Sequence, residues 1–273
     1  MEIFAIAVVL GIVEGLTEFL PVSSTGHLII AGHLLGFVGE RAASFEVAIQ
    51  LGAILSVVFL YWNRFRGLLV PDVAYLPKNS TLKGMPGILR ITVATLPALI
   101  VGFLARHMIK ERLFTPTAVT AALFVGGIAI LLADKFVRER RKTSVDSITI
   151  GQALGVGLFQ VLALWPGTSR SAATIVGGML LGLDRKGAAE FSFLIAVPIM
   201  CIATGYEMVK MRNLFAAQDF AQFAVGFVVS FIVALVTVKA FVNFLGRGSL
   251  APFAWYRIII APIFYLLIRS SVF

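Results

Sequence analysis

The chain has 273 residues, of which 59% are hydrophobic and only 14% are charged. A soluble domain carries roughly 25% charged residues, so the composition excludes an ordinary soluble protein. Several apolar stretches approach the ~20 residues that a helix needs to cross a bilayer. We therefore predict an all-α polytopic membrane protein. The net charge of +9 is assigned to basic residues that flank the spans and contact anionic lipid, and not to nucleic-acid binding.

A polar stretch interrupts the first apolar helix. Residues 3–19 predict a helix that contains Glu14-Gly-Leu-Thr-Glu18, and a break at Pro21 precedes a second helix over 27–36. Two half-length helices around a polar break predict a re-entrant hairpin. Lipid cannot satisfy the broken backbone, so protein must surround it or water must reach it.

A second hairpin follows in the other half of the chain. Its helices are predicted over 148–165 and 172–182, with a break at Pro166-Gly167. Between and after the two hairpins, apolar stretches predict six transmembrane helices. These are residues 43–62, 88–106, 116–134, 187–208, 220–245 and 252–269.

The two halves form an internal repeat. A shift of 146 residues places segment 11–49 on segment 157–195 without a gap, with twelve of 39 positions identical. The halves extend over about 1–134 and 148–270, and the basic linker 135–147 joins them within one integral membrane domain, residues 1–273. Three spans per half is an odd number, so the second hairpin enters from the opposite face. The repeat is thus predicted to have inverted topology, and the two hairpin tips can meet near the midplane.

Positive charge predicts the orientation. The face that contains the linker 135–147 carries twice as many Lys and Arg residues as the opposite face. Because basic loops stay on the cytoplasmic side, that face is predicted to be cytoplasmic. Both termini and the mouth of the first hairpin are then expected on the periplasmic, outer face.

The first tip contains two acids and a candidate base. Glu14 and Glu18 share one helix face, which suits either a divalent metal or general acid–base chemistry. Ser23, Ser24 and Thr25 precede a helix, where hydroxyls cap the N-terminus and amides attract phosphate.

His27 lies three residues after Ser24 and is the candidate base that would activate the Ser24 hydroxyl as a nucleophile. A lone histidine is more often structural, but the neighbouring glutamates and hydroxyls favour a functional role here. His33 and His107 have no such neighbours and are assigned structural roles.

The second tip contains Arg170 in the turn Pro166-Gly-Thr-Ser-Arg-Ser171. A planar guanidinium binds phosphate oxygens in a bidentate manner, and a structural ion pair with Glu14 or Glu18 is the alternative. Ser169, Ser171 and Thr174 add donors for an anion. Both tips together suit a substrate with a phosphate head and an apolar tail.

These residues carry a resemblance to a known family. Glu14-Gly-Leu-Thr-Glu18, Pro21-Val-Ser-Ser-Thr-Gly-His27 and Pro166-Gly-Thr-Ser-Arg-Ser171 with Thr174 resemble the motifs of the undecaprenyl-diphosphate phosphatase family, also known as the bacitracin-resistance family. The resemblance runs from about residue 3 to the C-terminus. It implies a bacterial inner-membrane enzyme that hydrolyses the C55 isoprenyl diphosphate to the monophosphate, recycles the lipid carrier of cell-wall synthesis and confers bacitracin resistance.

The resemblance also implies a divalent cation, Mg²⁺ or Ca²⁺. The family's functional positions fall on Glu14, Glu18, Ser24, His27 and Arg170, and its supporting donors on Ser23, Thr25, Ser169, Ser171 and Thr174. We expect Glu14 and Glu18 to bind the cation and Arg170 to hold the diphosphate.

Two mechanisms stay open at this point. Either Ser24, activated by His27, attacks the terminal phosphorus, or water attacks directly with His27 or Glu18 as base. The rival function is a transporter or flippase of an isoprenyl phosphate lipid, because paired hairpins in inverted repeats are typical of secondary transporters. The expected partners are the isoprenyl diphosphate lipid and the bilayer, and a homodimer is left open.

Overall fold

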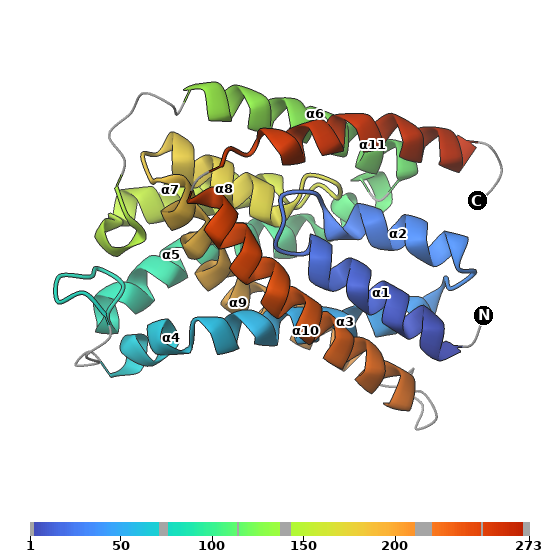
Figure 1. Ribbon diagram of the computed structural model, residues 1–273, viewed down its shortest axis with the longest axis horizontal. Coiled ribbons are helices and arrows are strands. Elements are labelled where there is room, and N and C mark those ends of the chain that lie inside the picture. Colours follow the sequence, from blue (N-terminus) through green and yellow to red (C-terminus); the bar gives the residue numbers. More distant parts are fainter. Residues whose placement is uncertain are drawn as a thin grey trace.

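The computed structural model describes residues 3–70, 76–113, 115–136, 143–210, 220–246 and 248–269. This part of the chain is helical and contains no β-strand, only an isolated bridge between Thr143 and Leu183 (Figure 1). Residues 137–142 of the predicted basic linker lie outside the described residues. The α-helices are α1 (Ile3–Thr17), α2 (Ser24–Leu34), α3 (Glu40–Leu60), α4 (Trp62–Leu69), α5 (Gly84–Met108), α6 (Pro116–Phe136), α7 (Ile150–Leu162), α8 (Arg170–Leu180), α9 (Arg185–Lys210), α10 (Phe220–Leu245) and α11 (Ala251–Arg269).

Five of the described helices are long and apolar enough to cross a bilayer. They are α3, α5, α6, α9 and α10, which coincide with five of the six predicted spans. The sixth predicted span, 252–269, is α11, which belongs with the shorter apolar helices. The prediction of an all-α polytopic membrane protein is confirmed at this level.

One helix was not predicted. Trp62–Leu69 forms the short helix α4 directly after the predicted span 43–62. Tyr61, Phe65 and Leu68 pack against the buried core, while the basic side chains between them obscure this apolar face in the sequence. Tertiary packing therefore stabilises a helix over 62–69 that the sequence pattern does not predict.

Two half-length helix pairs meet near the middle of the long axis (Figure 1). Helix α1 runs inward and α2 returns toward the end at which α1 begins, and α7 and α8 do the same from the other end. The first described residue of α1 and the last of α11 lie at the same end of the molecule. The breaks after Thr17 and Leu162 thus place two polar turns in the centre of an apolar protein.

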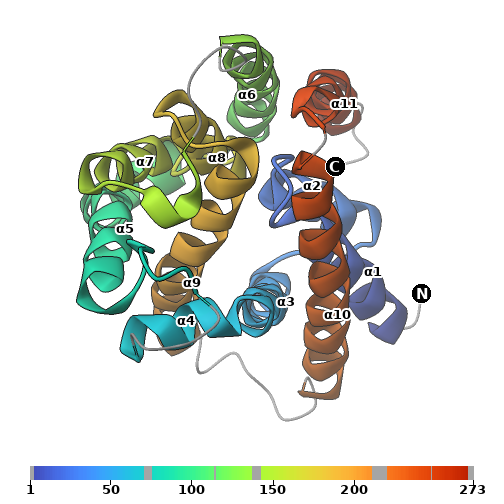
Figure 2. The same ribbon diagram turned by 60° about the vertical axis from the view of Figure 1, so that its left-hand side comes forward.

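Each hairpin packs on a long helix of the other half. Helix α1 lies along α10, and α7 lies along α5 (Figure 2). Equivalent glycines of the repeat permit both close approaches. A Cβ at Gly11 would lie 2.8 Å from the carbonyl oxygen of Gly226 in α10, and one at Gly157 would lie 2.6 Å from that of Ala94 in α5. Small residues therefore set how closely each hairpin approaches its partner helix.

Residues 76–83, the described segment before α5, form hydrogen bonds with the segment before α7. Arg64 of α4 forms a bidentate ion pair with Asp146, whose Oδ1 also accepts from Ser80 (2.6 Å). Partial burial raises the pKa of the Asp146 carboxyl, but the hydrogen bonds from Arg64 and Ser80 and the nearby positive charge outweigh it. The pKa therefore lies below its usual range. The loop is thus fixed by one carboxylate.

Candidate active site

Both tips begin their second helix with a strained serine. Ser23 is the residue before α2, with φ 72° and no capping hydrogen bond from its side chain, and Ser169 is the residue before α8, with φ 74°. They are the non-glycine residues with positive φ in the described chain. The 146-residue shift places one on the other. A non-glycine residue in this region costs of order 1–3 kcal/mol and persists where its surroundings enforce it. Both halves therefore retain the same unusual turn.

An ion pair joins the two tips. Arg170 Nη2 lies 3.1 Å from Glu18 Oε1, and both side chains are largely buried. Arg170 Nη1 donates to the carbonyl of Ser192 in α9 (3.2 Å), and its guanidinium carbon lies 5.6 Å from the ring centre of Phe19. The predicted meeting of the two tips is therefore realised through Arg170 and Glu18.

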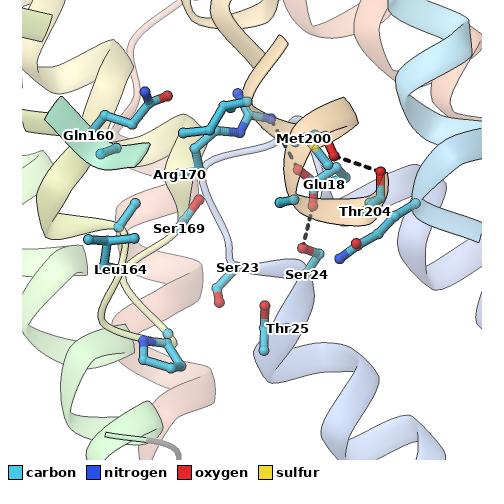
Figure 3. Close-up of a pocket in the computed structure, with 17 residues that line it drawn as sticks. Glu18, Ser23, Ser24, Thr25, Gln160, Leu164, Ser169, Arg170, Met200 and Thr204 are labelled. Atoms are coloured by element: carbon cyan, nitrogen blue, oxygen red, sulfur yellow. Dashed lines mark hydrogen bonds and ion pairs between the residues drawn. The ribbon is translucent and has the colours of Figure 1, made fainter. Parts of the chain in front are cut away.

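The hydroxyl of Ser24 contacts the same carboxylate. Ser24 Oγ donates to Glu18 Oε2 at 2.6 Å, so Glu18 binds a hydroxyl with one oxygen and a guanidinium with the other (Figure 3). A carboxylate that already accepts a hydrogen bond from a hydroxyl is placed to act as its base. The arrangement thus unites an acceptor for a proton, a candidate nucleophile and an anion-binding group.

The other hydroxyls of the second tip mainly brace it. Ser169 Oγ accepts from the amide of Ala172 (3.2 Å) as a helix cap. Ser171 Oγ donates to the carbonyl of Leu20 in the first tip (2.8 Å), and Thr174 Oγ1 lies 2.6 Å from Ser192 Oγ. Ser171 and Thr174 are fully buried by these contacts, whereas Ser169 lines a cavity.

The structure places His27 away from Ser24. Its Nδ1 donates to the carbonyl of Ser23 (2.7 Å), and its Nε2 lies 2.6 Å from the hydroxyl of Tyr256 in α11. The imidazole stacks on the Tyr256 ring with centroids 5.6 Å apart. Both ring nitrogens are therefore engaged, and the group in contact with Ser24 is Glu18.

Glu14 is fully buried, and neither of its oxygens has a hydrogen-bond partner within the described residues. A buried carboxylate without a partner is costly, and a bound cation would offset that cost. The described chain contains no group of three or more His, Cys, Asp or Glu side chains that could hold a metal. Glu14 and Glu18 therefore fit a cation that takes its other ligands from water or substrate oxygens, as Mg²⁺ commonly does.

A cavity of about 230 Å³ opens beside the ion pair (Figure 3). Residues of both tips form its polar part, and residues of α9 and the second turn form an apolar wall. The polar part includes Glu18, Ser23, Ser24, Thr25, Ser169 and Arg170, and the apolar wall includes Leu164, Ile199 and Met200. The cavity therefore offers polar and apolar surfaces to the same ligand.

A second arginine, Arg257 of α11, forms hydrogen bonds with both tips. Its side chain is fully buried, and all of its polar atoms donate to backbone carbonyls. Nη1 bonds to Pro21 (3.2 Å) in the first tip and Thr168 (2.9 Å) in the second. Nη2 and Nε bond to Gly167 and to two residues of α6, Ala122 and Leu123. One guanidinium thus connects both broken turns to two helices.

The chain matches one family model along most of its length. Residues 7–263 match the family described as bacitracin resistance protein BacA. The chain belongs to the BacA family. The protein named undecaprenyl-diphosphatase of Maridesulfovibrio salexigens is 57% identical over 94% of this chain and 96% of its own. The protein of the same name from Nitratidesulfovibrio vulgaris strain DP4 is 56% identical over 95% of this chain and 96% of its own. That of Lawsonia intracellularis, also of the same name, is 49% identical over 98% of this chain and 100% of its own.

This BacA-family chain brings most of the predicted residues together. Glu18 contacts both Ser24 and Arg170, and Ser23, Thr25 and Ser169 line the same cavity. Glu14 lies one turn before Glu18 and does not line the cavity, and His27 faces Tyr256. Ser171 and Thr174 form hydrogen bonds that brace the second tip against Leu20 and Ser192.

Sequence reasoning did not assign a role to Arg257, although a signal was present. An arginine within a predicted span is expensive in lipid and indicates a specific partner. The usual partner is a carboxylate, and no carboxylate in α11 or its flanks suggests one. The partners are backbone carbonyls of broken helices, which no pattern of side chains reveals.

We predict that Arg257→Met lowers the free energy of unfolding by about 3–5 kcal/mol, because several buried carbonyls lose their donor. Unfolding of the purified protein in detergent, followed by circular dichroism, measures this change. Arg106→Met is the control, since Arg106 is exposed and, within the described part of the chain, its side chain contacts Tyr206 and Phe103. Equal stability of the two variants would contradict the bracing role of Arg257.

Proposed function

We propose that this protein is an undecaprenyl-diphosphatase, which hydrolyses the C55 isoprenyl diphosphate to the monophosphate and phosphate. The observation that carries the proposal is the contact of Arg170, Glu18 and Ser24 at the meeting of two helix breaks. Membership of the BacA family and the relatives of that name support it. The activity recycles the lipid carrier of cell-wall synthesis and gives resistance to bacitracin.

The cavity suits the two ends of such a substrate. The diphosphate is anionic and fits Arg170 and the hydroxyls around it, since a guanidinium binds phosphate oxygens strongly. The apolar wall at Leu164, Ile199 and Met200 fits the first part of the isoprenyl chain, and the rest of the chain can lie in the bilayer. Binding of the diphosphate to Arg170 releases Glu18 from its ion pair.

Ser24 is the proposed nucleophile. Its Oγ attacks the terminal phosphorus, its proton passes to Glu18 Oε2, and the bridging P–O bond breaks so that the lipid monophosphate leaves. Water then attacks the phosphoserine, and the bond between phosphorus and Ser24 Oγ breaks. Ser24 Oγ takes back the proton held by Glu18, and the departing phosphate carries the oxygen and both protons of the water. Arg170 stabilises the charge on the transferred group. The contact between Ser24 and Glu18 favours Glu18 as base over His27.

A divalent cation, Mg²⁺ or Ca²⁺, is part of the proposal. Glu14 and Glu18 would hold it, which gives the unpartnered Glu14 carboxylate a role. When bound, such an ion neutralises charge on the diphosphate.

The proposed topology has six transmembrane helices and two re-entrant hairpins related by an inverted repeat. The opposite directions of the two hairpins in Figure 1, the shared strained serine and the reciprocal packing of α1 and α7 support it. We place the protein in the bacterial inner membrane, with both termini and the mouth of the site on the periplasmic face. A homodimer stays a prediction.

Proteoliposomes that contain undecaprenyl diphosphate and no ion gradient should release inorganic phosphate. EDTA should stop the release, and added Mg²⁺ or Ca²⁺ should restore it. Phosphate colorimetry and separation of the lipids measure the product. Gradient-driven movement of the lipid without phosphate release would instead indicate a transporter and contradict the phosphatase.

Ser24→Ala should lower kcat by at least about 10³-fold, because loss of a covalent nucleophile typically has an effect of that size or more. Rapid acid quench of the wild-type reaction should trap a phosphoserine at Ser24, detected by mass spectrometry. Ser56→Ala is the matched control, since Ser56 is also buried and, within the described residues, donates to the Ala53 carbonyl in α3. If Ser24→Ala keeps most of its turnover, water attacks directly.

Cysteine labelling tests the orientation in a Cys201→Ala background. A cysteine at exposed Val38 should react with a membrane-impermeant maleimide on intact spheroplasts. A cysteine at exposed Lys78 should react only after permeabilisation. The reverse pattern would place the site mouth on the cytoplasmic face.

A further inference from the structure

Gln160 of α7 lines the cavity and has an unused hydrogen-bond acceptor. Its side chain is 1% exposed, and its Nε2 donates to the carbonyl of Ala94 in α5 at 3.2 Å. Its Oε1 has no partner in the described part of the chain. Because buried amide oxygens are almost always hydrogen-bonded, an unused one at a cavity wall indicates a ligand.

The packing of α7 fixes the direction of the amide. Gly157 lets α7 approach α5 so closely that Gln160, one turn later, reaches the same Ala94 carbonyl. Only the NH₂ end of an amide can donate to a carbonyl, so Oε1 is left as the free end. The acceptor is therefore held in place before any ligand binds.

Arg170 has a complementary unused donor. Its two terminal nitrogens bond to Glu18 and Ser192, whereas Nε is buried without an acceptor among the described residues. Both side chains line the cavity, and Figure 3 shows the Gln160 amide on the Arg170 side of it. One acceptor and one donor thus remain unpaired in two side chains that line the same cavity. A single hydroxyl-bearing oxygen, as in water or a protonated phosphate, satisfies both.

The repeat explains why the acceptor is neutral. Gln160 occupies the position equivalent to Glu14 under the 146-residue shift, and Arg170 occupies that of Ser24. A carboxylate at 160 would bring an extra negative charge to the cavity that receives the diphosphate. An amide retains the acceptor oxygen without that repulsion.

We propose that Gln160 is a further substrate-contacting residue. Its Oε1 accepts a hydrogen bond from a hydroxyl-bearing oxygen to which Arg170 Nε donates, and this oxygen belongs to the protonated diphosphate or to a water molecule bound against it. The inference rests on the proposed phosphatase activity, and wild-type turnover tests that activity separately.

The test compares Gln160→Leu and Gln160→Glu with the wild type. We expect Gln160→Leu to raise KM for undecaprenyl diphosphate about tenfold and to change kcat less than about threefold, as loss of one buried hydrogen bond would. Gln160→Glu should raise KM further, because it adds a negative charge. Gln222→Leu is the matched control: Gln222 is a buried glutamine of α10 with an unpartnered amide, and it lies outside the cavity.

Thermal unfolding of each variant separates binding from folding. Gln160→Leu and Gln222→Leu should have similar Tm values and different KM values. Equal KM values for Gln160→Leu, Gln222→Leu and the wild type would overturn the proposal, as would a rise in KM that the control shares. If Gln160→Leu does not fold, Gln160→Asn takes its place. Asparagine keeps the amide but shortens it, and should raise KM similarly.

The pH dependence identifies the bound oxygen. If the oxygen belongs to the protonated diphosphate, the KM ratio of Gln160→Leu to wild type falls toward one as pH rises through the last ionisation of the diphosphate. If the oxygen belongs to water, the ratio stays about tenfold at every pH. A ratio of one at every pH excludes both ligands.

Discussion

The structure depends on how the guanidinium of Arg257 satisfies the carbonyl groups of two broken helices. In an apolar environment an unpaired carbonyl is costly, so a helix break in the membrane needs a donor from another element. Arg257 supplies five N–H groups in a rigid fork that reaches both tips and α6. A lysine has three N–H groups on one nitrogen and could not donate to all of the carbonyls that Arg257 reaches. Because the tips are held together, Arg170 meets Glu18.

The two arginines use the same group for different purposes. Arg257 is saturated by neutral carbonyls and has no access to the cavity, so it acts as a frame. Arg170 keeps one N–H unpaired, shares a carboxylate with Ser24 and lines the cavity. An ion pair that a substrate phosphate can replace is suited to binding, whereas a set of backbone bonds is suited to bracing. The strained serines Ser23 and Ser169 persist because this frame enforces their turns.

Much of this arrangement could be predicted from the sequence because polar residues in apolar helices are informative. The breaks at Pro21 and Pro166, and the meeting of Arg170 with an acid, follow from residue types and the repeat. The partner of His27 could not be predicted, since Tyr256 lies 229 positions away and no pattern in the sequence connects the two residues. Glu18, and not His27, contacts Ser24 because α2 begins at Ser24 itself, and the Ser24 hydroxyl therefore faces α1. The backbone carbonyls that accept from Arg257 could not be predicted either, because a pattern of side chains does not reveal them.

The glycine contacts at Gly11 and Gly157 have a consequence for biosynthesis. Helix α1 rests on α10, which is made more than two hundred residues later, whereas α7 finds α5 already synthesised. When the first hairpin is synthesised, its partner helix does not yet exist. When the second hairpin is synthesised, its partner helix is already present. The packing of the first hairpin on its partner helix is therefore completed only after α10 has been synthesised. The two halves of the repeat are alike in sequence and unlike in the order in which they become native.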